Sequence, residues 1–203
     1  MAAFHHNAEL SCPPAGWWMR SLVTSLLIWS GISMAAEPPA PTVDELKAAV
    51  VYQITRFVEW PEGQSTNAPL VVGLVGDGPF ITALEKMLAN AKPVQGRPLT
   101  IQRLAPNLSP LEAAQVKILV LSGRLQERTM STILKAVADS GALTISDSND
   151  FCRKGGMVGL REVDKRVQLE VNLEACERAR LRLSSRLLRQ AKIVAGNPSV
   201  LQK

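Results

Sequence analysis

Short apolar runs, each followed by a helical pattern, constrain the fold of this chain most strongly. LVVGLVG (70–76) and VKILVLS (116–122) are almost continuously apolar, as strands are when helices cover both faces of a sheet. LTIQRL (99–104) and LTIS (143–146) are two further short strand patterns. Because helical patterns separate the strands, the strands are predicted to be parallel and joined by right-handed crossovers. We therefore predict an α/β fold with a mostly parallel sheet flanked by helices.

The last part of the chain has a different pattern. MVGLREV (157–163) and RVQLEVN (166–172) are separated by two residues, and the second segment alternates apolar and polar side chains. This pattern predicts an antiparallel hairpin at the edge of the sheet near the C-terminus. Two helical segments, LEACERARL (173–181) and SSRLLRQAKIV (184–194), are expected to follow it.

A capping box marks the start of the first helix. Thr42 is followed three residues later by Glu45, and apolar residues then recur at three- and four-residue steps in a stripe expected to face the core. Pro61 is expected to end this helix after Trp60. We predict a single domain at 42–195 and a flexible tail at 196–203.

The residues before this domain have the pattern of an export signal. Arg20 precedes a short apolar stretch, and small residues close it, which is typical of a signal peptide cleaved after Ala35. The stretch is too short to span a bilayer comfortably. We predict a leader and signal peptide at 1–35, a proline-rich spacer at 36–41, and a mature protein in the periplasm.

Residue types that common enzymes need are scarce in the predicted mature chain. The two histidines, His5 and His6, lie in the predicted leader, so no serine or cysteine nucleophile has an imidazole base. Zinc or copper would find only thiolates and carboxylates as ligands. The glycines of GLVGDGP (73–79) lack the spacing of a dinucleotide-binding loop. We therefore expect no enzymatic activity, no cofactor and no metal site.

Two acidic residues follow predicted strands. Asp77 lies at the carboxyl end of the first strand, where open α/β sheets bind their ligands, and is a candidate ligand-binding residue. SDSNDF (146–151) resembles a calcium loop but is followed by neither the glycine nor the glutamate that such a loop requires. Asp77 and Asp147 are also a candidate acid–base pair, provided that the fold brings them together.

Cys152 and Cys176 are the two cysteines outside the predicted leader. An even pair in an exported protein is most simply a disulfide, which here would tie the hairpin to the helix after it. Two separate buried thiols are the alternative, because the bond requires Cα atoms within about 7 Å of each other. We predict the disulfide.

Basic residues exceed acidic ones, and the formal net charge is +5. Arg153 and Lys154, before the glycine pair of the turn that leads into the hairpin, are candidates for binding an anion. Arg182 and Arg186 are further candidates, on an expected helical face with Arg189, although a solvated face is the alternative. Outside the cytoplasm the partners of such a surface are small anions, acidic proteins or lipid head groups, and not nucleic acid.

Two aromatic residues lie at the end of the first predicted helix. Phe57 and Trp60 stand beside Arg56 and Glu59. Aromatic residues and arginine are favoured as interface anchors, so Phe57 and Trp60 are candidates for a partner interface. The alternative is that both belong to the core.

Taken together, several segments resemble the YfiR-like family of periplasmic regulatory proteins. They are LKAAVVYQITRFVEWPEG (46–63), LVVGLVGDGPF (70–80), GRPL (96–99), ILVLS (118–122), LTISDSNDFCRKGGMVGL (143–160), RVQLEVNLEA (166–175) and LRLSSRLLRQAKIV (181–194). The resemblance implies an α/β domain that dimerises and regulates an inner-membrane diguanylate cyclase through its periplasmic part. It also implies redox sensitivity through disulfides in some members, which have four cysteines where this chain has two after the leader.

Three functions remain as hypotheses. The resemblance favours a periplasmic protein that binds and represses an inner-membrane diguanylate cyclase, and so controls cyclic-di-GMP signalling and biofilm formation. A periplasmic module that binds a small anion and acts through another membrane sensor is the alternative. An enzyme is the third hypothesis, and the lack of histidine argues against it.

Overall fold

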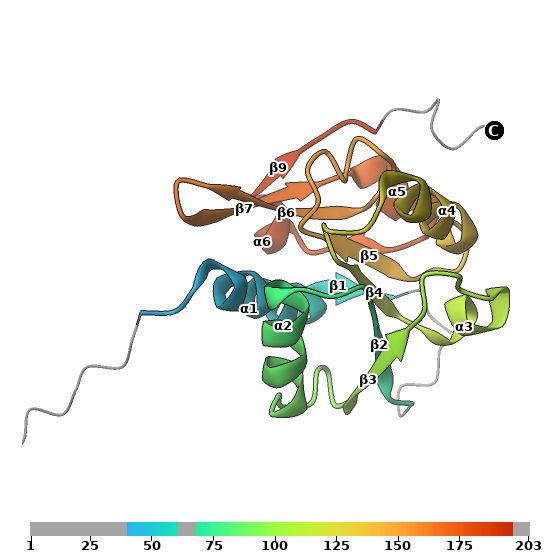
Figure 1. Ribbon diagram of the computed structural model, residues 1–203, viewed down its shortest axis with the longest axis horizontal. Coiled ribbons are helices and arrows are strands. Elements are labelled where there is room, and N and C mark those ends of the chain that lie inside the picture. The colour runs from blue at the N-terminus through green and yellow to red at the C-terminus, as the bar shows by residue number, and fades with distance from the viewer. Residues whose placement is uncertain (1–39, 61–67, 197–203) are drawn as a thin grey trace, which may run out of the picture. The chain divides into compact units, whose positions relative to one another are not determined.

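The computed structural model describes residues 40–60 and 68–196, and the account below concerns the compact unit that begins at Pro41. Within these residues, seven strands form one sheet in the order β3-β2-β4-β5-β6-β7-β9 (Figure 1). The predicted leader and signal peptide at 1–35, most of the spacer and nearly all of the predicted tail lie outside the described residues. The predicted domain limits stay a prediction.

The main sheet consists of β2 (Leu70–Val75), β3 (Leu99–Leu104), β4 (Ile118–Leu121), β5 (Leu143–Ser146), β6 (Val158–Val163), β7 (Arg166–Val171) and β9 (Ala191–Ile193). The helices are α1 (Val43–Thr55), α2 (Pro79–Ala89), α3 (Pro110–Gln115), α4 (Glu127–Val137), α5 (Leu173–Arg178) and α6 (Ser185–Leu188). A separate two-stranded antiparallel sheet pairs β1 (Val58–Glu59) with β8 (Arg182–Leu183). The pairs from β3 through β6 are parallel, β6 and β7 are antiparallel, and β9 is parallel to β7. The predicted α/β fold with a mostly parallel sheet is confirmed.

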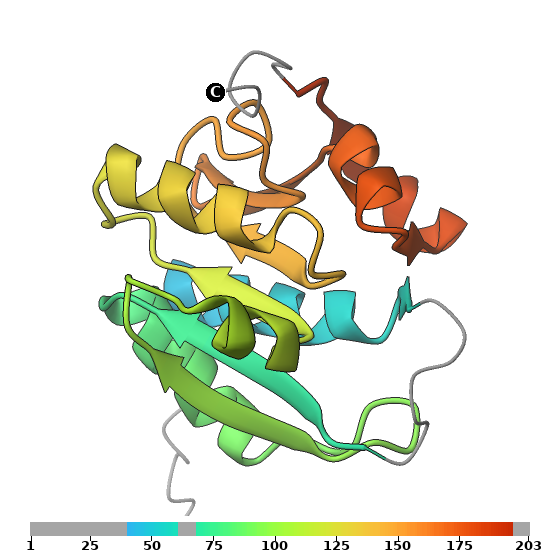
Figure 2. The same cartoon turned by 90° about the vertical axis from the view of Figure 1, so that its right-hand side faces the viewer.

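Side chains of β4 fill two cores, one on each face of the sheet. Ile118 and Val120 belong to the core beneath α1 and α2, whereas Leu119 and Leu121 belong to the core beneath α3 and α4. Figure 2 shows α3 and α4 in front of the sheet and α1 behind it. Burial on both faces explains why this strand has no polar residue.

Helix α1 begins where the sequence predicts and ends earlier. Thr42 is the N-cap, and its capping box with Glu45 is complete. The helix ends at Thr55 and not after Trp60, and the Thr55 hydroxyl donates to the Tyr52 carbonyl at 2.7 Å. The chain then forms β1, because pairing with β8 satisfies its backbone groups. The predicted helix end was wrong because tertiary pairing outweighed the helical pattern.

The buried face of α1 also differs from the predicted stripe. Leu46 and Val50 of that stripe are half-buried, whereas Ala48 and Val51 are fully buried. Helix α1 packs against both α2 and β7, so two flanks of the helix contact the rest of the protein. The fully buried face of the helix therefore includes Ala48 and Val51, and Val50 is only half-buried.

The predicted hairpin is confirmed, but it does not lie at the edge of the sheet. β9 pairs with β7 and takes the edge position. The segment 184–194, predicted as one helix, forms the short α6 and then β9, because its second half completes the hydrogen bonds of β7. Arg182, Arg186 and Arg189 therefore do not share a helical face: they lie in β8, in α6 and at the C-cap of α6.

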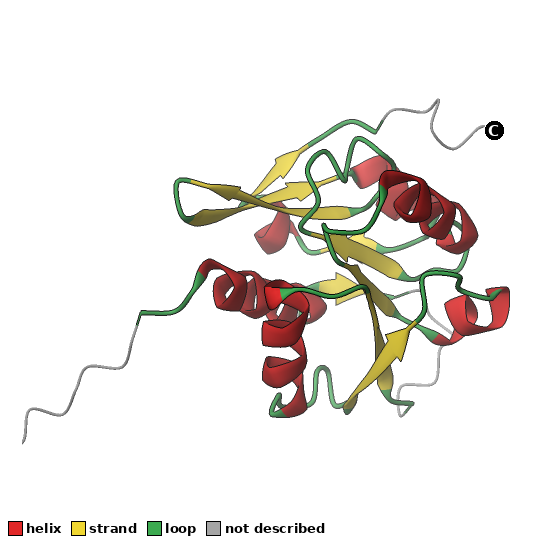
Figure 3. Ribbon diagram, in the orientation of Figure 1, coloured by secondary structure: helices red, strands yellow, loops and turns green. Residues whose placement is uncertain are grey.

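The outer half of this hairpin, here called the hairpin arm (residues 161–168), extends beyond the neighbouring strands (Figure 3). β5 pairs with β6 at Val158 and Gly159, and β9 pairs with β7 from Leu169 onward. The two turn residues, Asp164 and Lys165, have φ of 49° and 59°. Both values suit the tight turn that matches the twist of the strands. Among the described residues, none of the helices has both the length and the apolar character that a bilayer crossing requires.

The turn before β6 accounts for the glycine pair of FCRKGGMVGL. Gly155 has φ of 97°, which glycine adopts without strain. A side chain at Gly156 would overlap the ring of Phe151, which is 1 % exposed. The segment is therefore a turn into a strand, and packing of Phe151 requires the second glycine.

Candidate functional site

A groove of about 1020 Å³ lies between α1, the hairpin arm and α6. Its apolar lining residues, most of them buried or half-buried, are Val50, Phe57, Val163, Val167, Leu169 and Leu187. Its polar lining residues are exposed, and they are Gln53, Asp164, Arg166, Gln168, Arg186 and Gln190. An apolar lining with a polar rim is the usual composition of a binding site.

Two residues singled out from the sequence meet in this groove. The guanidinium carbon of Arg186 lies 5.7 Å from the centre of the Phe57 ring. This distance suits a cation–π interaction, worth about 0.5–1 kcal/mol at an exposed site. Phe57 itself is half-buried against the main core. The contact holds the arginine at the groove and leaves its donor groups available to a partner.

The charge of the groove is positive. Arg166 and Arg186 are its two cationic residues, and Asp164 is its acidic one. Within the described part of the chain, neither arginine forms a salt bridge. Two arginines without acidic partners at an apolar groove are able to bind an anionic group through paired hydrogen bonds.

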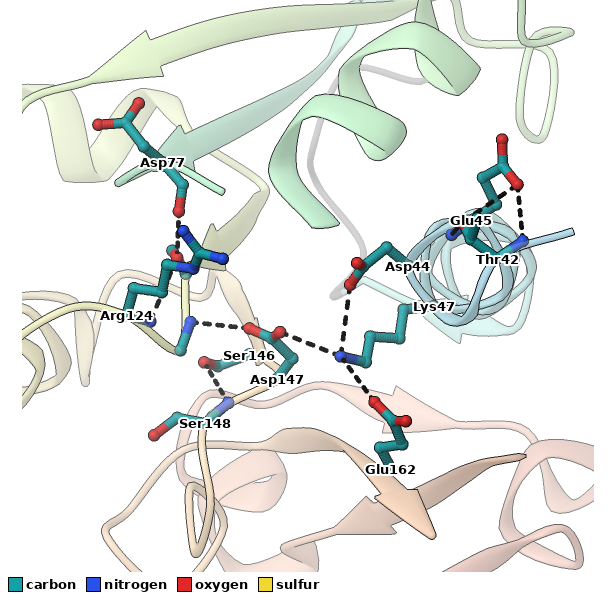
Figure 4. A network of polar contacts seen from close by, with 12 residues as sticks. Thr42, Asp44, Glu45, Lys47, Asp77, Arg124, Ser146, Asp147, Ser148 and Glu162 are labelled. Carbon is teal, nitrogen blue, oxygen red and sulfur yellow. Dashed lines mark hydrogen bonds and ion pairs between the residues drawn. The ribbon is translucent and has the colours of Figure 1, made fainter. Parts of the chain in front are cut away.

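A buried lysine connects α1 to the hairpin arm (Figure 4). Lys47 Nζ lies 3.3 Å from Asp147 Oδ2, 3.5 Å from Asp44 Oδ1 and 3.9 Å from Glu162 Oε2. Its side chain is 10 % exposed, so water screens these contacts poorly. Glu162 belongs to the hairpin arm, directly before Val163 of the groove. The lysine therefore links α1 to the loop after β5 and, through its longest contact, to one wall of the groove.

Asp147 reaches this lysine because of its place in the sheet. It follows β5, and its Oδ1 accepts a hydrogen bond of 2.7 Å from the backbone N–H of Gly123, which follows β4. A Cβ on Gly123 would lie 2.9 Å from that oxygen, so the close approach requires glycine. The two loops come together because β4 and β5 are adjacent parallel strands whose carboxyl ends share one edge.

The structure places Asp77 at the same edge, but turned outward. Its side chain is 94 % exposed and lies 3.2 Å from Arg103, which also binds Glu85 at 2.6 Å and lowers the pKa of that carboxyl. Figure 4 shows the Asp77 carboxylate pointing away from Asp147. The two carboxylates contact different cations, so the geometry does not support the candidate acid–base pair.

The other predicted anion-binding residues lie apart from the groove. Arg153 and Lys154 are in the loop between β5 and β6, where Arg153 lies 3.5 Å from Asp150 and Lys154 lies 3.0 Å from Glu127. Arg182 lies in β8, opposite Glu59 of β1. Arg186 is therefore the predicted ligand-binding residue that lines the groove, and the other predicted ligand-binding residues lie elsewhere.

Trp60 is the second residue predicted at a partner interface. It is half-buried and packs against the main core, as Phe57 does. Its Nε1 is buried and has no hydrogen-bond partner among the described residues. The groove lining includes Phe57 and not Trp60.

The predicted disulfide is absent, and this prediction is corrected. Cys152 and Cys176 are free, buried thiols, which was the alternative. The sulfur of Cys152 donates to the Met157 carbonyl at 3.6 Å, so it is directed toward its own loop. Burial raises the pKa of each thiol to about 12, and the charges of Glu170 and Glu177 add to the effect at Cys152 and Cys176 respectively. The two residues act as small apolar side chains in the core.

Sequence reasoning missed Lys47 and Arg166. Lys47 is one charged residue in an amphipathic helix, and its burial depends on Asp147, which is 100 positions away. Arg166 begins β7, and its place in the groove depends on α6. No local pattern marks either residue. Within the described ranges, no three histidine, cysteine or acidic side chains are arranged to bind a metal.

The sequence of the chain matches a known protein family. A family model described as YfiR/HmsC-like matches residues 44–192, from α1 to β9. The matched range includes both the groove and the Lys47 contacts. Comparison with curated proteins gave no match.

Proposed function

Because the chain belongs to the YfiR/HmsC-like family, we propose that it is a periplasmic regulatory protein that binds and represses an inner-membrane diguanylate cyclase. Repression in this way controls cyclic-di-GMP signalling and biofilm formation. The observation that carries the proposal is the family match over most of the chain, and the groove at Phe57 and Arg186 supplies a surface for the partner.

Such a regulator acts by differential binding. A protein that binds the periplasmic part of the cyclase more tightly in its inactive conformation shifts the cyclase toward that conformation. No chemistry at the regulator is required. A half-buried aromatic residue beside an arginine suits this role, because aromatic residues and arginine are favoured as anchors of protein interfaces.

The place of action follows from the predicted export signal. The mature protein begins near Ala36, acts in the periplasm and forms a homodimer. Mass spectrometry of the periplasmic fraction tests the first two statements. A chain that retains Trp29 and stays in the membrane pellet would contradict them. Sedimentation equilibrium of the purified protein tests the third, and a monomer at all concentrations would refute it.

Deletion of the gene tests the regulatory role. We expect cyclic-di-GMP and surface attachment to rise, and the wild-type gene to restore both. Phe57→Glu is expected not to restore them, because a charge replaces the aromatic anchor. Leu111→Glu is the matched control, since Leu111 is 71 % exposed on α3, on the other face of the sheet. It introduces the same charge and is expected to restore both.

Two results would contradict these expectations. An unchanged cyclic-di-GMP level after deletion would refute the cyclase as partner, and favour a small-anion binding module that acts through another membrane sensor. If Phe57→Glu and Trp60→Glu proteins both fail to accumulate, this corner is core and the proposed interface is wrong. Immunoblotting of periplasmic extracts separates loss of binding from loss of the protein.

A further inference from the structure

We propose that the groove binds an acidic peptide segment with an apolar anchor residue, contributed by the periplasmic part of the membrane partner. The inference rests on the proposed function, because it names the chemistry of the partner at the same site. The groove lies between α1, the hairpin arm and α6, and the family model matches residues of all three.

The lining requires an apolar group from the partner. Leu169 and Leu187 are buried beneath the groove, and Val50, Val167 and the Phe57 ring are half-buried in its walls. Val163, at the end of β6, is 37 % exposed, and among the described residues only Leu111 and Ile193 are other large apolar residues exposed to this extent. An apolar side chain in the groove removes this surface from water, which is favourable in proportion to the area covered.

The charges require carboxylates beside that anchor. Arg166 on the hairpin arm and Arg186 on α6 approach the groove from two elements, and neither forms a salt bridge within the described residues. Asp164 offsets one of them at most. Carboxylates placed on either side of an apolar residue would pair with the two arginines while the residue fills the lining.

Charge also argues against a second copy of this chain as the occupant. The protein has a formal net charge of +5, and in a two-fold symmetric contact the same patch meets itself. Arg166 and Arg186 of the two copies would then face each other, with an aspartate from each copy to offset four cations. Like charges in contact disfavour this arrangement. The extent of apolar lining also exceeds what a small inorganic anion contacts.

The test uses the full-length exported protein and a displayed library of random 12-residue peptides. Enriched peptides are expected to contain aspartate or glutamate around an aromatic or aliphatic residue. Their dissociation constants, measured by fluorescence anisotropy with the synthetic peptide, are expected to rise about tenfold with Arg186→Glu or Arg166→Glu, and to rise with sodium chloride. Enrichment of basic or uncharged peptides, or an affinity that Arg186→Glu leaves unchanged, would overturn the proposal.

Two further variants control for folding and for charge. Arg128→Glu makes the same charge change in the first turn of α4, on the opposite face of the sheet, and is expected to leave the affinity unchanged. An equal loss of affinity with Arg128→Glu would show that the effect comes from the overall charge of the protein, and would overturn the proposed site. Arg186→Gln removes the charge with little change in size, and thermal unfolding checks that each variant is folded.

Other occupants give distinguishable results. If the wild-type protein dimerises in sedimentation equilibrium and Arg186→Glu abolishes the dimer, the proposal is overturned in favour of a second copy. If the wild-type protein sediments with anionic phospholipid vesicles and the same variant does not, it is overturned in favour of a membrane surface. Failure of the proposed function is separate. If deletion raises cyclic-di-GMP but the groove variants return it fully to the wild-type level, the peptide site is wrong and the proposed regulatory role stands. If deletion has no effect on cyclic-di-GMP, the proposed function is wrong, and peptide binding still tests the groove.

Discussion

Replacement of Lys47 by methionine removes the one cation that three carboxylates share, and keeps most of the volume of its stem. The side chain of Asp147 is 17 % exposed, that of Asp44 is 34 % exposed and that of Glu162 is 49 % exposed, and their distances to Nζ increase in the same order. Loss of one partner from a fully buried pair costs about 3–5 kcal/mol, and from an exposed pair about 0.2–1 kcal/mol. Because Asp147 keeps its hydrogen bond from Gly123, we expect a loss of about 2 kcal/mol.

Separate substitutions of the carboxylates grade this effect. Asp147→Asn is expected to reduce the free energy of unfolding most, followed by Asp44→Asn at about 0.5 kcal/mol and Glu162→Gln at about 0.3 kcal/mol. The double variant Lys47→Met with Asp147→Asn isolates the pair, and a coupling energy of about 1–2 kcal/mol is expected.

Urea unfolding at pH 7, followed by circular dichroism, measures these free energies. Amide exchange in the hairpin arm provides a local readout, because Lys47 holds Glu162 in that arm, and faster exchange is expected in Lys47→Met. A Lys47→Met protein within about 0.5 kcal/mol of the wild type, or single effects that add without coupling, would refute the expected contribution of the Lys47–Asp147 pair. Unchanged amide exchange in the hairpin arm would show that the lysine does not anchor the arm.

Three further changes test local features. Cys152 and Cys176 are expected to resist a thiol reagent at pH 8 in the native protein, and both are expected to react after denaturation without reductant. Because the folded pKa of about 12 exceeds the unfolded pKa, the contribution of the two thiols to stability is full below about pH 8.5 and falls as the pH rises toward 12. One or no reactive thiol after denaturation would contradict this. Lys165→Gly is expected to raise the free energy of unfolding by about 1 kcal/mol, since φ is 59° there, and a lower melting temperature would count against the turn geometry. Gly156→Ala is expected to destabilise by about 1–3 kcal/mol through overlap with Phe151, whereas an unchanged melting temperature would mean that the turn rearranges.

The features predicted correctly from the sequence have local causes. The strands β2 and β4 are short, almost continuously apolar runs, and burial on both faces of a sheet demands that composition. The start of α1 depends on a side chain and a backbone group three residues apart. The hairpin of β6 and β7 follows from alternation around a two-residue turn. In each case the residues that decide the structure are neighbours in the chain.

The features that were missed depend on residues distant in the chain. Helix α1 ends at Thr55 because β1 pairs with β8, and two-residue strands have no periodicity to detect. The sequence of β9 has a helical pattern, but the segment forms a strand because its backbone pairs with β7. The two cysteines allowed a disulfide or two thiols, and in the fold both are buried as free thiols, with the Cys152 sulfur donating to the Met157 carbonyl.

The candidate site shows the same division. By itself the sequence determined the α/β fold and the family, and it marked Phe57 and Arg186 as two separate candidates, one for a partner interface and one for binding an anion. Only the tertiary structure decided that they touch, that Arg166 joins them and that Lys47 contacts the arm beside them. The physical reason is that aromatic, cationic and carboxylate side chains bind according to distance and burial, and both are fixed by how α1, the hairpin arm and α6 pack together.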